Sequence, residues 1–292
     1  MSSAVRIIQG QFGRVALLDM DRPLVTHAHS QCHVLLKASG ADTYFGVRDG
    51  LQPLTDETAV LVNTWEPHYY GHEDGAPETV ILALYIEPSW LASLDGVLAS
   101  SAHPRFFLQS CVEISPTIRH LTQDLTADLL YDMALDREAA EERVFELMIA
   151  IIDQFSEWRS LRRALRMARI PTDYRIRRAI SYMRENLGEP LDVNRLAEAA
   201  GLSRSHFFKT FRENTGLTPR VYSSVLRMES AIKCIAGTKQ SMGELAFDLG
   251  FSAQSHFTRF FQSHQGVAPS DYRRIVEVFE STRSAEGSAA RI

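Results

Sequence analysis

The chain has 292 residues, a formal net charge of -5, 45% hydrophobic residues and three cysteines. This length allows two domains, and the apolar content is enough for ordinary buried cores. The first twenty residues lack the basic-then-apolar order of a signal peptide, and no run approaches the roughly 18 apolar residues of a membrane span. Three widely spaced cysteines form neither a disulfide framework nor a CxxC site. We therefore expect free thiols, a cytoplasmic location and no membrane partner.

The two halves of the chain carry opposite charge. Residues 159–292 hold 22 Lys and Arg against 13 Asp and Glu, a net charge of +9. Residues 1–158 hold the other 9 Lys and Arg against 23 Asp and Glu, a net charge of -14. An asymmetry of this kind predicts that only the C-terminal half meets a polyanion.

Residues 5–88 are expected to form short strands separated by turns. The candidate strands are Arg14–Asp19, His33–Lys37, Thr43–Val47, Ala59–Asn63 and Thr79–Ile86. Short strands at this spacing are typical of an all-β barrel or sandwich.

A histidine motif lies inside this segment. His27, His29 and His33 precede Gly40 with the spacing His-x-His-x3-His-x6-Gly. The motif resembles the first motif of the cupin barrel, with His33 where that fold usually has a Glu. On a strand, residues 27, 29 and 33 share one face, so three imidazoles would converge on one metal ion. The alternative is that the histidines line a small-molecule pocket or pack in the core.

A second segment with pocket-forming residues follows at 65–72. Pro67-His68, with His72 after it, resembles the second cupin motif, and aromatic residues flank it. For the histidines of both motifs we predict that they line an effector pocket and bind neither a metal nor another cofactor. The aromatic residues line the same pocket or, alternatively, pack in the core. The residues assigned to effector binding are His27, His29, His33, Trp65, His68 and Tyr70.

From Ser115 the apolar period becomes helical and indicates two helices of about 20 residues each. The first apolar stripe comprises Ile118, Leu121, Leu125, Leu129 and Met133, and the second comprises Val144, Met148, Ile151, Phe155 and Trp158. We expect the second stripe to pack on another copy of the chain in a homodimer. The alternative is that both helices cover the barrel.

Two further stretches mark boundaries. Arginines recur through residues 159–169 without an acidic residue and end at Pro171. This run predicts a linker with a solvated helix face, or alternatively a contact with DNA phosphates or an acidic ligand. The tail 281–292 is rich in Ser, Ala and Arg and is predicted to be disordered.

The C-terminal half contains a duplicated motif. Leu196–Pro219, LAEAAGLSRSHFFKTFRENTGLTP, returns in degraded form as Leu245–Pro269, LAFDLGFSAQSHFTRFFQSHQGVAP. Both copies keep Leu-Ala, a turn Gly, Ser-His-Phe and a final Gly and Pro. Solenoids need about three copies to bury a continuous core, so a motif present twice is the better interpretation.

Each copy is predicted to form a helix, a tight turn and a second helix. The first helices begin near Asp192 and at Ser241, where Ser241-Met-Gly-Glu244 is a capping box. Ser203 and Ser252 are the expected N-caps of the second helices. Gly216 and Gly266 would end these helices in the left-handed conformation. Such a pair is a helix-turn-helix, whose second helix enters the DNA major groove.

The second copy carries the most specific pattern. Its residues are Gly250-Phe251-Ser252, Gln254-Ser255-His256-Phe257, Arg259, Phe261, Gly266, Pro269 and Tyr272-Arg273. The pattern resembles the signature of the AraC/XylS family of transcriptional regulators, and the resemblance covers about Tyr174 to Arg274. Ala253 and Gln262 depart from that signature, which usually has an acidic and a basic residue there. The resemblance implies sequence-specific binding to promoter DNA, control by a small-molecule effector, contact with RNA polymerase and, by family habit, activation.

Between the motifs, Pro219 at the first helical position opens a helix to about Ala236. Eighteen residues at about 1.5 Å each give roughly 27 Å, which can set two recognition helices about one DNA turn apart. The residues assigned to DNA contact are Arg204, Ser205, Phe208, Lys209 and Arg212 in the first recognition helix, and Gln254, Ser255, His256, Thr258 and Arg259 in the second.

The sequence thus predicts an α+β chain, with an N-terminal cupin-like β-barrel carrying dimerisation helices and a C-terminal all-α domain with two helix-turn-helix motifs. The predicted bounds are 1–114 for the effector-binding domain, 115–158 for the dimerisation segment, 159–172 for the basic linker, 173–280 for the DNA-binding domain and 281–292 for the tail. The alternative function is a metal-dependent cupin enzyme with a helical appendage. The basic duplicated motif, which an enzyme does not need, argues against it.

Overall fold

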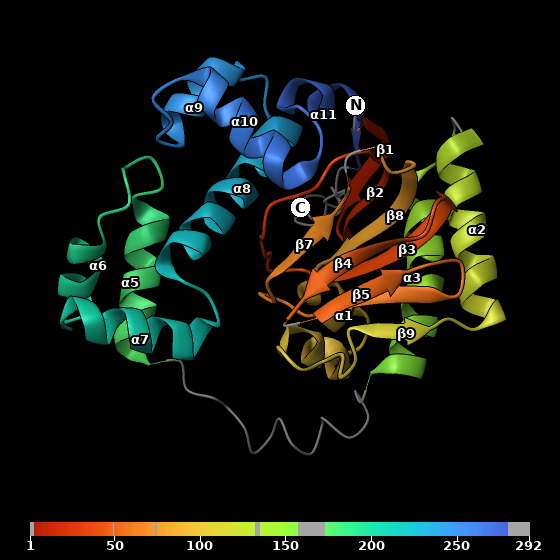
Figure 1. The fold of residues 1–292 in the computed structure, drawn as a ribbon, viewed down its shortest axis with the longest axis horizontal. Coiled ribbons are helices and arrows are strands. Elements are labelled where there is room, and N and C mark those ends of the chain that lie inside the picture. Colours follow the sequence, from red (N-terminus) through yellow and green to blue (C-terminus); the bar gives the residue numbers. More distant parts are fainter. Residues whose placement is uncertain (1–2, 49, 74, 132–134, 157–172, 280–292) are drawn as a thin grey trace, which may run out of the picture.

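The structure, a computed structural model, describes residues 3–48, 50–73, 75–131, 135–156 and 173–279. These residues form a β-rich N-terminal body and a helical C-terminal body (Figure 1). The predicted α+β class and the two helix-turn-helix motifs are confirmed. The predicted basic linker 159–172 and the tail 281–292 lie outside the described residues.

The β-rich body contains a seven-stranded sheet in the order β10-β1-β2-β8-β3-β6-β9 and a three-stranded sheet in the order β5-β4-β7. The strands are β1 Ser3–Gly10, β2 Gly13–Met20, β3 Cys32–Gly40, β4 Thr43–Val47, β5 Gly50–Leu54, β6 Thr58–Val62, β7 His68–Gly71, β8 Thr79–Ile86, β9 Cys111–Glu113 and β10 Val276–Val278. All five predicted strands are present. The strands β1, β5, β7, β9 and β10 were not predicted.

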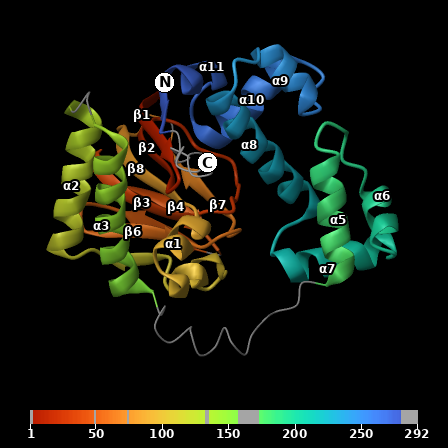
Figure 2. The same cartoon turned by 180° about the vertical axis from the view of Figure 1, so that it is seen from behind.

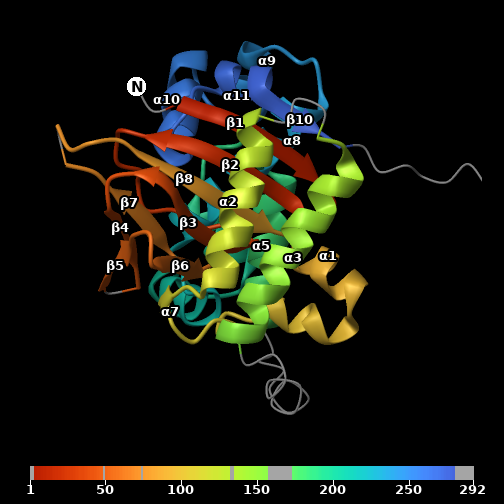
Figure 3. The same ribbon diagram turned by 90° about the vertical axis from the view of Figure 1, so that its right-hand side faces the viewer.

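The large sheet is covered on both faces. Successive side chains of a strand point to opposite sides, so Val15 and Leu17 of β2 lie in one core while Ala16 and Leu18 lie in the other. The first core is completed by helices α2 (Pro116–Tyr131) and α3 (Arg137–Phe155). The second is completed by the small sheet and by helices of the C-terminal body. Figures 2 and 3 show α2 and α3 on the side of the sheet away from the helical body.

Three residues of the expected dimer stripe are buried inside the chain, whereas Phe155 is partly buried and Trp158 lies outside the described residues. Val144, Met148 and Ile151 of α3 are each 0% exposed and pack in the first core. The prediction that these side chains face a partner chain is therefore wrong, because they cover the apolar face of the large sheet. Short helical segments α1 (Pro88–Leu94) and η1 (Gly96–Ala102) lie at the same core.

The helical body contains two helix-turn-helix units joined by one long helix. Its helices are α5 Tyr174–Glu185, α6 Val193–Ala199, α7 Arg204–Thr215, α8 Pro219–Gly237, α9 Met242–Asp248, α10 Gln254–Gln265 and α11 Pro269–Ile275. The long helix α8 runs from the first unit to the second (Figure 1). The recognition helices of the two motifs are α7 and α10.

Local capping signals set most of these boundaries. The Ser203 side chain accepts a hydrogen bond from the backbone N–H of His206, and Ser241 and Glu244 form the predicted capping box. Gly216 and Gly266 end α7 and α10 with φ of 73° and 76°. The predicted cap at Ser252 is wrong. Helix α10 starts after Ala253, without a side-chain cap, and the Ser252 hydroxyl instead lies 3.0 Å from Nδ1 of His256.

The two turn glycines differ in their surroundings, which gives a test of the second motif. A methyl group at Gly250 would lie 2.4 Å from the carbonyl oxygen of Gly188, whereas one at Gly201 meets nothing within 4 Å. Both glycines have positive φ, so each Ala substitution incurs about 1–2 kcal/mol of backbone strain. We expect Gly250→Ala to reduce the free energy of unfolding by clearly more than the matched control Gly201→Ala in urea denaturation. Equal losses would show that the Gly188 loop moves aside without cost.

Candidate effector and DNA sites

The recognition helices present their predicted contact residues to solvent. The core positions Phe207, Phe211, Phe257 and Phe261 are 0% exposed, and none of the ten residues assigned to DNA contact is buried. On α10, an open surface hollow is lined by Gln254, Ser255, Thr258, Arg259 and Gln262. On α7, the corresponding hollow is lined by Ser205, Phe208, Lys209, Arg212, Glu213 and Thr218. The two motifs therefore expose equivalent faces of different composition.

The charged residues of these faces are available for a polyanion. Within the described part of the chain, neither Arg212 nor Arg259 makes an ion pair, and Lys209 reaches only Glu213, at 4.0 Å. Phe208 keeps 37% of its surface exposed beside these polar side chains. Phe208 is therefore not buried inside the domain.

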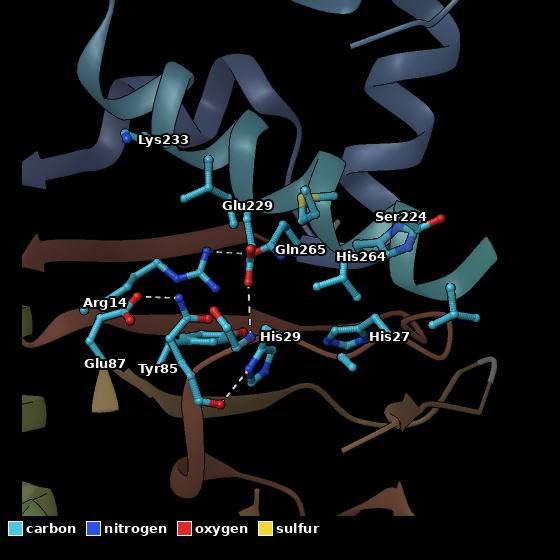
Figure 4. Close-up of a pocket in the computed structure, with 18 of the residues that line it drawn as sticks. Arg14, His27, His29, Tyr85, Glu87, Ser224, Glu229, Lys233, His264 and Gln265 are labelled. Carbon is cyan, nitrogen blue, oxygen red and sulfur yellow. Dashed lines mark hydrogen bonds between the residues drawn. The ribbon is translucent and has the colours of Figure 1, made fainter. Parts of the chain in front are cut away.

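A cavity of about 510 Å³ lies between the two bodies (Figure 4). The β-rich body supplies one wall and α8 and α10 supply the other. Its polar and charged lining includes Arg14, His27, His29, Tyr85, Glu87, Arg220, Glu229, Lys233, His264 and Gln265. Of the residues assigned to effector binding, only His27 and His29 line this cavity. Neighbours of these histidines and Tyr85 line it as well. Arg14 and the residues of α8 are far from the histidine motif in the sequence, so no local motif indicated them.

The remaining assigned residues lie elsewhere. Trp65 stacks on Tyr222 of α8, with ring centroids 4.7 Å apart and planes at 2°. Tyr70 is buried in the β-rich body, where its hydroxyl lies 3.3 Å from Oγ1 of Thr43. His33 and His68 are buried behind the cavity wall. Trp65 therefore joins the two bodies, and Tyr70 belongs to the core.

The histidines lie close together in the structure, although not on one shared strand as predicted. His27 and His29 precede β3, which begins at Cys32, so residues 27, 29 and 33 do not share a strand. Instead the backbone of His27 pairs with that of His68 through two hydrogen bonds of 2.9 Å. This pairing joins the first histidine segment to the start of β7, and brings His68 into the cluster.

Each of three rings is oriented by a backbone carbonyl. Nδ1 of His27 donates to Val25 at 2.8 Å, Nδ1 of His29 to Gln31 at 3.1 Å, and Nδ1 of His68 to Glu66 at 2.9 Å. Burial lowers the pKa of His27, His29 and His33 well below the ordinary value, and lowers that of His68 to about 4. The cluster is therefore a set of neutral imidazoles at pH 7.

Arg14 forms a polar link between the bodies. Its guanidinium donates to Oε1 of Gln265 at 2.7 Å and lies 3.7 Å from the ring centre of Tyr85. Only 7% of Arg14 is exposed, its guanidinium also lies 3.4 Å from the Tyr272 hydroxyl, and among the described residues it forms no ion pair. A buried cation without an anionic partner is costly, so this position favours an anionic group in the adjoining cavity.

The second motif is also attached to the large sheet. β10, directly after α11, runs parallel to β1 with Ile8 opposite Glu277. The backbone N–H of Val25 donates to the carbonyl of Ser263 in α10 at 3.1 Å. The second recognition helix thus rests on the body that contains the histidine cluster.

Comparison with known proteins agrees with both halves of this architecture. Residues 21–148 match the family described as AraC-like ligand binding domain, and residues 196–275 match a helix-turn-helix domain family. The chain belongs to the AraC family of transcriptional regulators. Its curated relatives bear the names of regulators and not of enzymes, which removes the support for the enzyme alternative.

Two relatives and one structure illustrate the similarity. The MmsAB operon regulatory protein of Pseudomonas aeruginosa is 33% identical over 109 residues, 37% of this chain and 34% of that protein. The Msm operon regulatory protein of Streptococcus mutans is 32% identical over 90 residues, 31% of this chain and 32% of that protein. The matches thus span about a third of these curated relatives. The crystal structure of an apo ToxT variant from Vibrio cholerae shares the fold. The match covers 90% of this chain and 97% of the ToxT chain, with a TM-score of 0.55 and 14% sequence identity.

Among the described residues, no helix is long and apolar enough to cross a membrane.

Proposed function

We propose that this AraC-family chain binds promoter DNA through α7 and α10 and is controlled by a small-molecule effector bound between the two bodies. The observation that carries the proposal is the shared lining of the cavity, in which Arg14 and His29 of the β-rich body lie opposite Glu229 of α8 (Figure 4). A ligand in contact with both bodies binds most tightly to one relative position of them. Since α8 joins the two DNA-binding motifs, such a ligand would be coupled to operator affinity.

The lining favours a small organic effector with a polar or anionic end and an apolar part. Arg14, Arg220 and Lys233 supply positive charge, and Glu87 and Glu229 supply acceptors. Val225, Met228 and Ile232 of α8 offer apolar contacts to the other part of the ligand. A cavity of about 510 Å³ lies within the usual range for small-molecule sites.

The DNA part of the proposal rests on two exposed faces at the ends of one long helix. Arg259 suits bidentate pairing with guanine, and Gln254 suits adenine. Because α7 and α10 differ in sequence, the two half-sites should differ as well. The family resemblance adds activation of transcription through contact with RNA polymerase, and a homodimer. Such a dimer would need residues other than the buried stripe of α3.

The test is a thermal-shift screen of metabolites on the full chain, because the cavity needs both bodies. A ligand at 100 times its Kd stabilises the folded state by about 2.7 kcal/mol and raises the melting temperature. Operator duplexes selected from a random pool are then titrated with and without that ligand. We expect the ligand to change operator affinity several-fold or more.

Ser224→Trp supplies the control, since Ser224 lies on α8 at the cavity and a Trp there would fill it. This variant should bind operator but lose the response to the ligand. A ligand that binds without altering operator affinity would remove effector control from the proposal. If no duplex binds in a salt-dependent way, the DNA-binding part is wrong.

A further inference from the structure

Each of the three carbonyl-bound histidines keeps one ring nitrogen that is available as a ligand. Because Nδ1 of His27, His29 and His68 carries the hydrogen that each donates to a carbonyl, Nε2 of each ring bears a lone pair. The potential ligand atoms of these three residues all lie within 4.8 Å of one another. Metal-binding histidines show the same arrangement, with the second nitrogen held by a carbonyl or carboxylate.

Hydrogen bonding within the cluster leaves these lone pairs largely unsatisfied. Nδ1 of His33 lies 3.0 Å from Nε2 of His29 and 3.3 Å from Nε2 of His68. It has at most one hydrogen to donate, so it satisfies one of them at most. Nε2 of His33 is itself buried without a hydrogen-bond partner. Besides the three bonds to carbonyls, the remaining ring nitrogens of the cluster share at most one hydrogen bond with one another. Core packing explains this poorly for the buried Nε2 of His33, since buried polar groups are normally paired.

We propose that Nε2 of His27, His29 and His68 binds one divalent first-row transition-metal ion, with His33 as the adjacent fourth imidazole. The sequence led us to expect no metal, and the orientation of the ring nitrogens changes that expectation. An all-imidazole set selects ions such as Zn²⁺, Co²⁺, Ni²⁺ or Fe²⁺ over Mg²⁺ and Ca²⁺, which prefer oxygen ligands.

The position of the site gives the ion a regulatory role beyond the proposed effector pocket. His27 and His29 line the interdomain cavity, so a coordination position left open by the protein faces it. Three neutral ligands leave the ion with its full positive charge, which would hold an anionic donor atom of a ligand. The same loop contacts the second recognition helix, where the rings of His27 and His264 lie 6.2 Å apart. Metal occupancy therefore fixes a loop that touches α10.

The test uses the full chain, purified without a polyhistidine tag, stripped with chelator and titrated with Co²⁺ alone. We expect visible d–d absorption that saturates at about one equivalent, loss of that absorption on adding Zn²⁺, and a higher melting temperature with either ion. This titration needs no variant, so it decides the site even where a substitution impairs folding. Absence of binding by the folded wild-type chain at about 100 µM Co²⁺ would overturn the proposal.

Variants then locate the ion. His27→Ala and His68→Ala should each weaken Co²⁺ binding at least about 100-fold, because each removes one of three ligands. His264→Ala is the matched control, since His264 is a partly buried neighbour of His27 that lies outside the ligand set, and it should bind like wild type. Folded His27→Ala and His68→Ala chains that bind Co²⁺ as tightly as wild type would place the ion elsewhere and overturn the assignment. Both results are independent of DNA binding, so they are separate from failure of the proposed function.

Discussion

Ile151→Asp is expected to unfold the β-rich body and not to dissociate a dimer. Ile151 lies on α3 with 0% of its surface exposed, in the core between the helix and the large sheet. The substitution removes a buried aliphatic side chain, at a cost of about 2–5 kcal/mol, and places a carboxylate among apolar groups. The lost apolar side chain and the buried carboxylate together cost about as much as the whole stability of an ordinary domain, about 5–15 kcal/mol. Circular dichroism and urea denaturation would show the loss.

Gln154→Asp is the matched control, since Gln154 is exposed on the same helix one turn nearer its end. This change should alter the free energy of unfolding by less than about 0.5 kcal/mol. A folded Ile151→Asp chain that sediments at half the mass of wild type would instead support the partner-facing role of the stripe, and would contradict the burial seen here.

For the helices at 115–158, the apolar pattern predicted the helices themselves and did not predict what their apolar faces pack against. Apolar spacing predicted that α2 and α3 exist and which face of each is apolar, because that depends only on the helical repeat. It did not predict what covers the face, because a partner chain and a sheet both satisfy it. The signal was present in β2, where Val15, Ala16, Leu17 and Leu18 are consecutive apolar residues. A strand apolar on both faces needs cover on both, and the nearest helices supply it.

The helix-turn-helix units were predicted well because their determinants are local. Caps, turn glycines and the apolar spacing of each short helix lie within about 25 residues of sequence. The one error, at Ser252, arises from the extra residue of the second copy, which makes Ala253 the residue before α10. Shifting a helix start by one position is enough to exchange a capping hydroxyl for a methyl group.

The cavity was largely hidden from the sequence because it is a tertiary feature. His27 and His29 were found through a motif, whereas Arg14 and Lys233 stand in segments that show no pattern linking them. Arg14 carried a weak signal, as a charged residue at the start of an apolar strand. The convergence of His68 with His27 and His29 depends on a backbone pairing between two irregular segments, which periodicity does not predict.

Arg259→Ala is expected to relax the preference for one base pair of the operator. Arg259 lies in the middle of α10, exposed beside Gln254, Ser255 and Thr258. A bidentate pair between arginine and guanine contributes about 1–3 kcal/mol of discrimination, which is roughly a 5- to 150-fold preference. Its loss should lower affinity for the operator and leave affinity for a scrambled duplex little changed. Titrations on both duplexes, at several salt concentrations, measure this difference.

Arg212→Ala is the matched comparison, an exposed arginine of the other recognition helix. Arg212 lies in the last turn of α7, where the helix would leave the groove in the proposed placement, so we assign it to a backbone phosphate. Its removal should weaken binding to operator and scrambled duplexes alike, and reduce the salt dependence by about one released counterion. The pair of variants therefore separates base reading from phosphate binding within one experiment. If Arg259→Ala weakens both duplexes equally while Arg212→Ala alters base preference, the two roles are exchanged, and α7 and α10 enter the grooves differently from the placement proposed here.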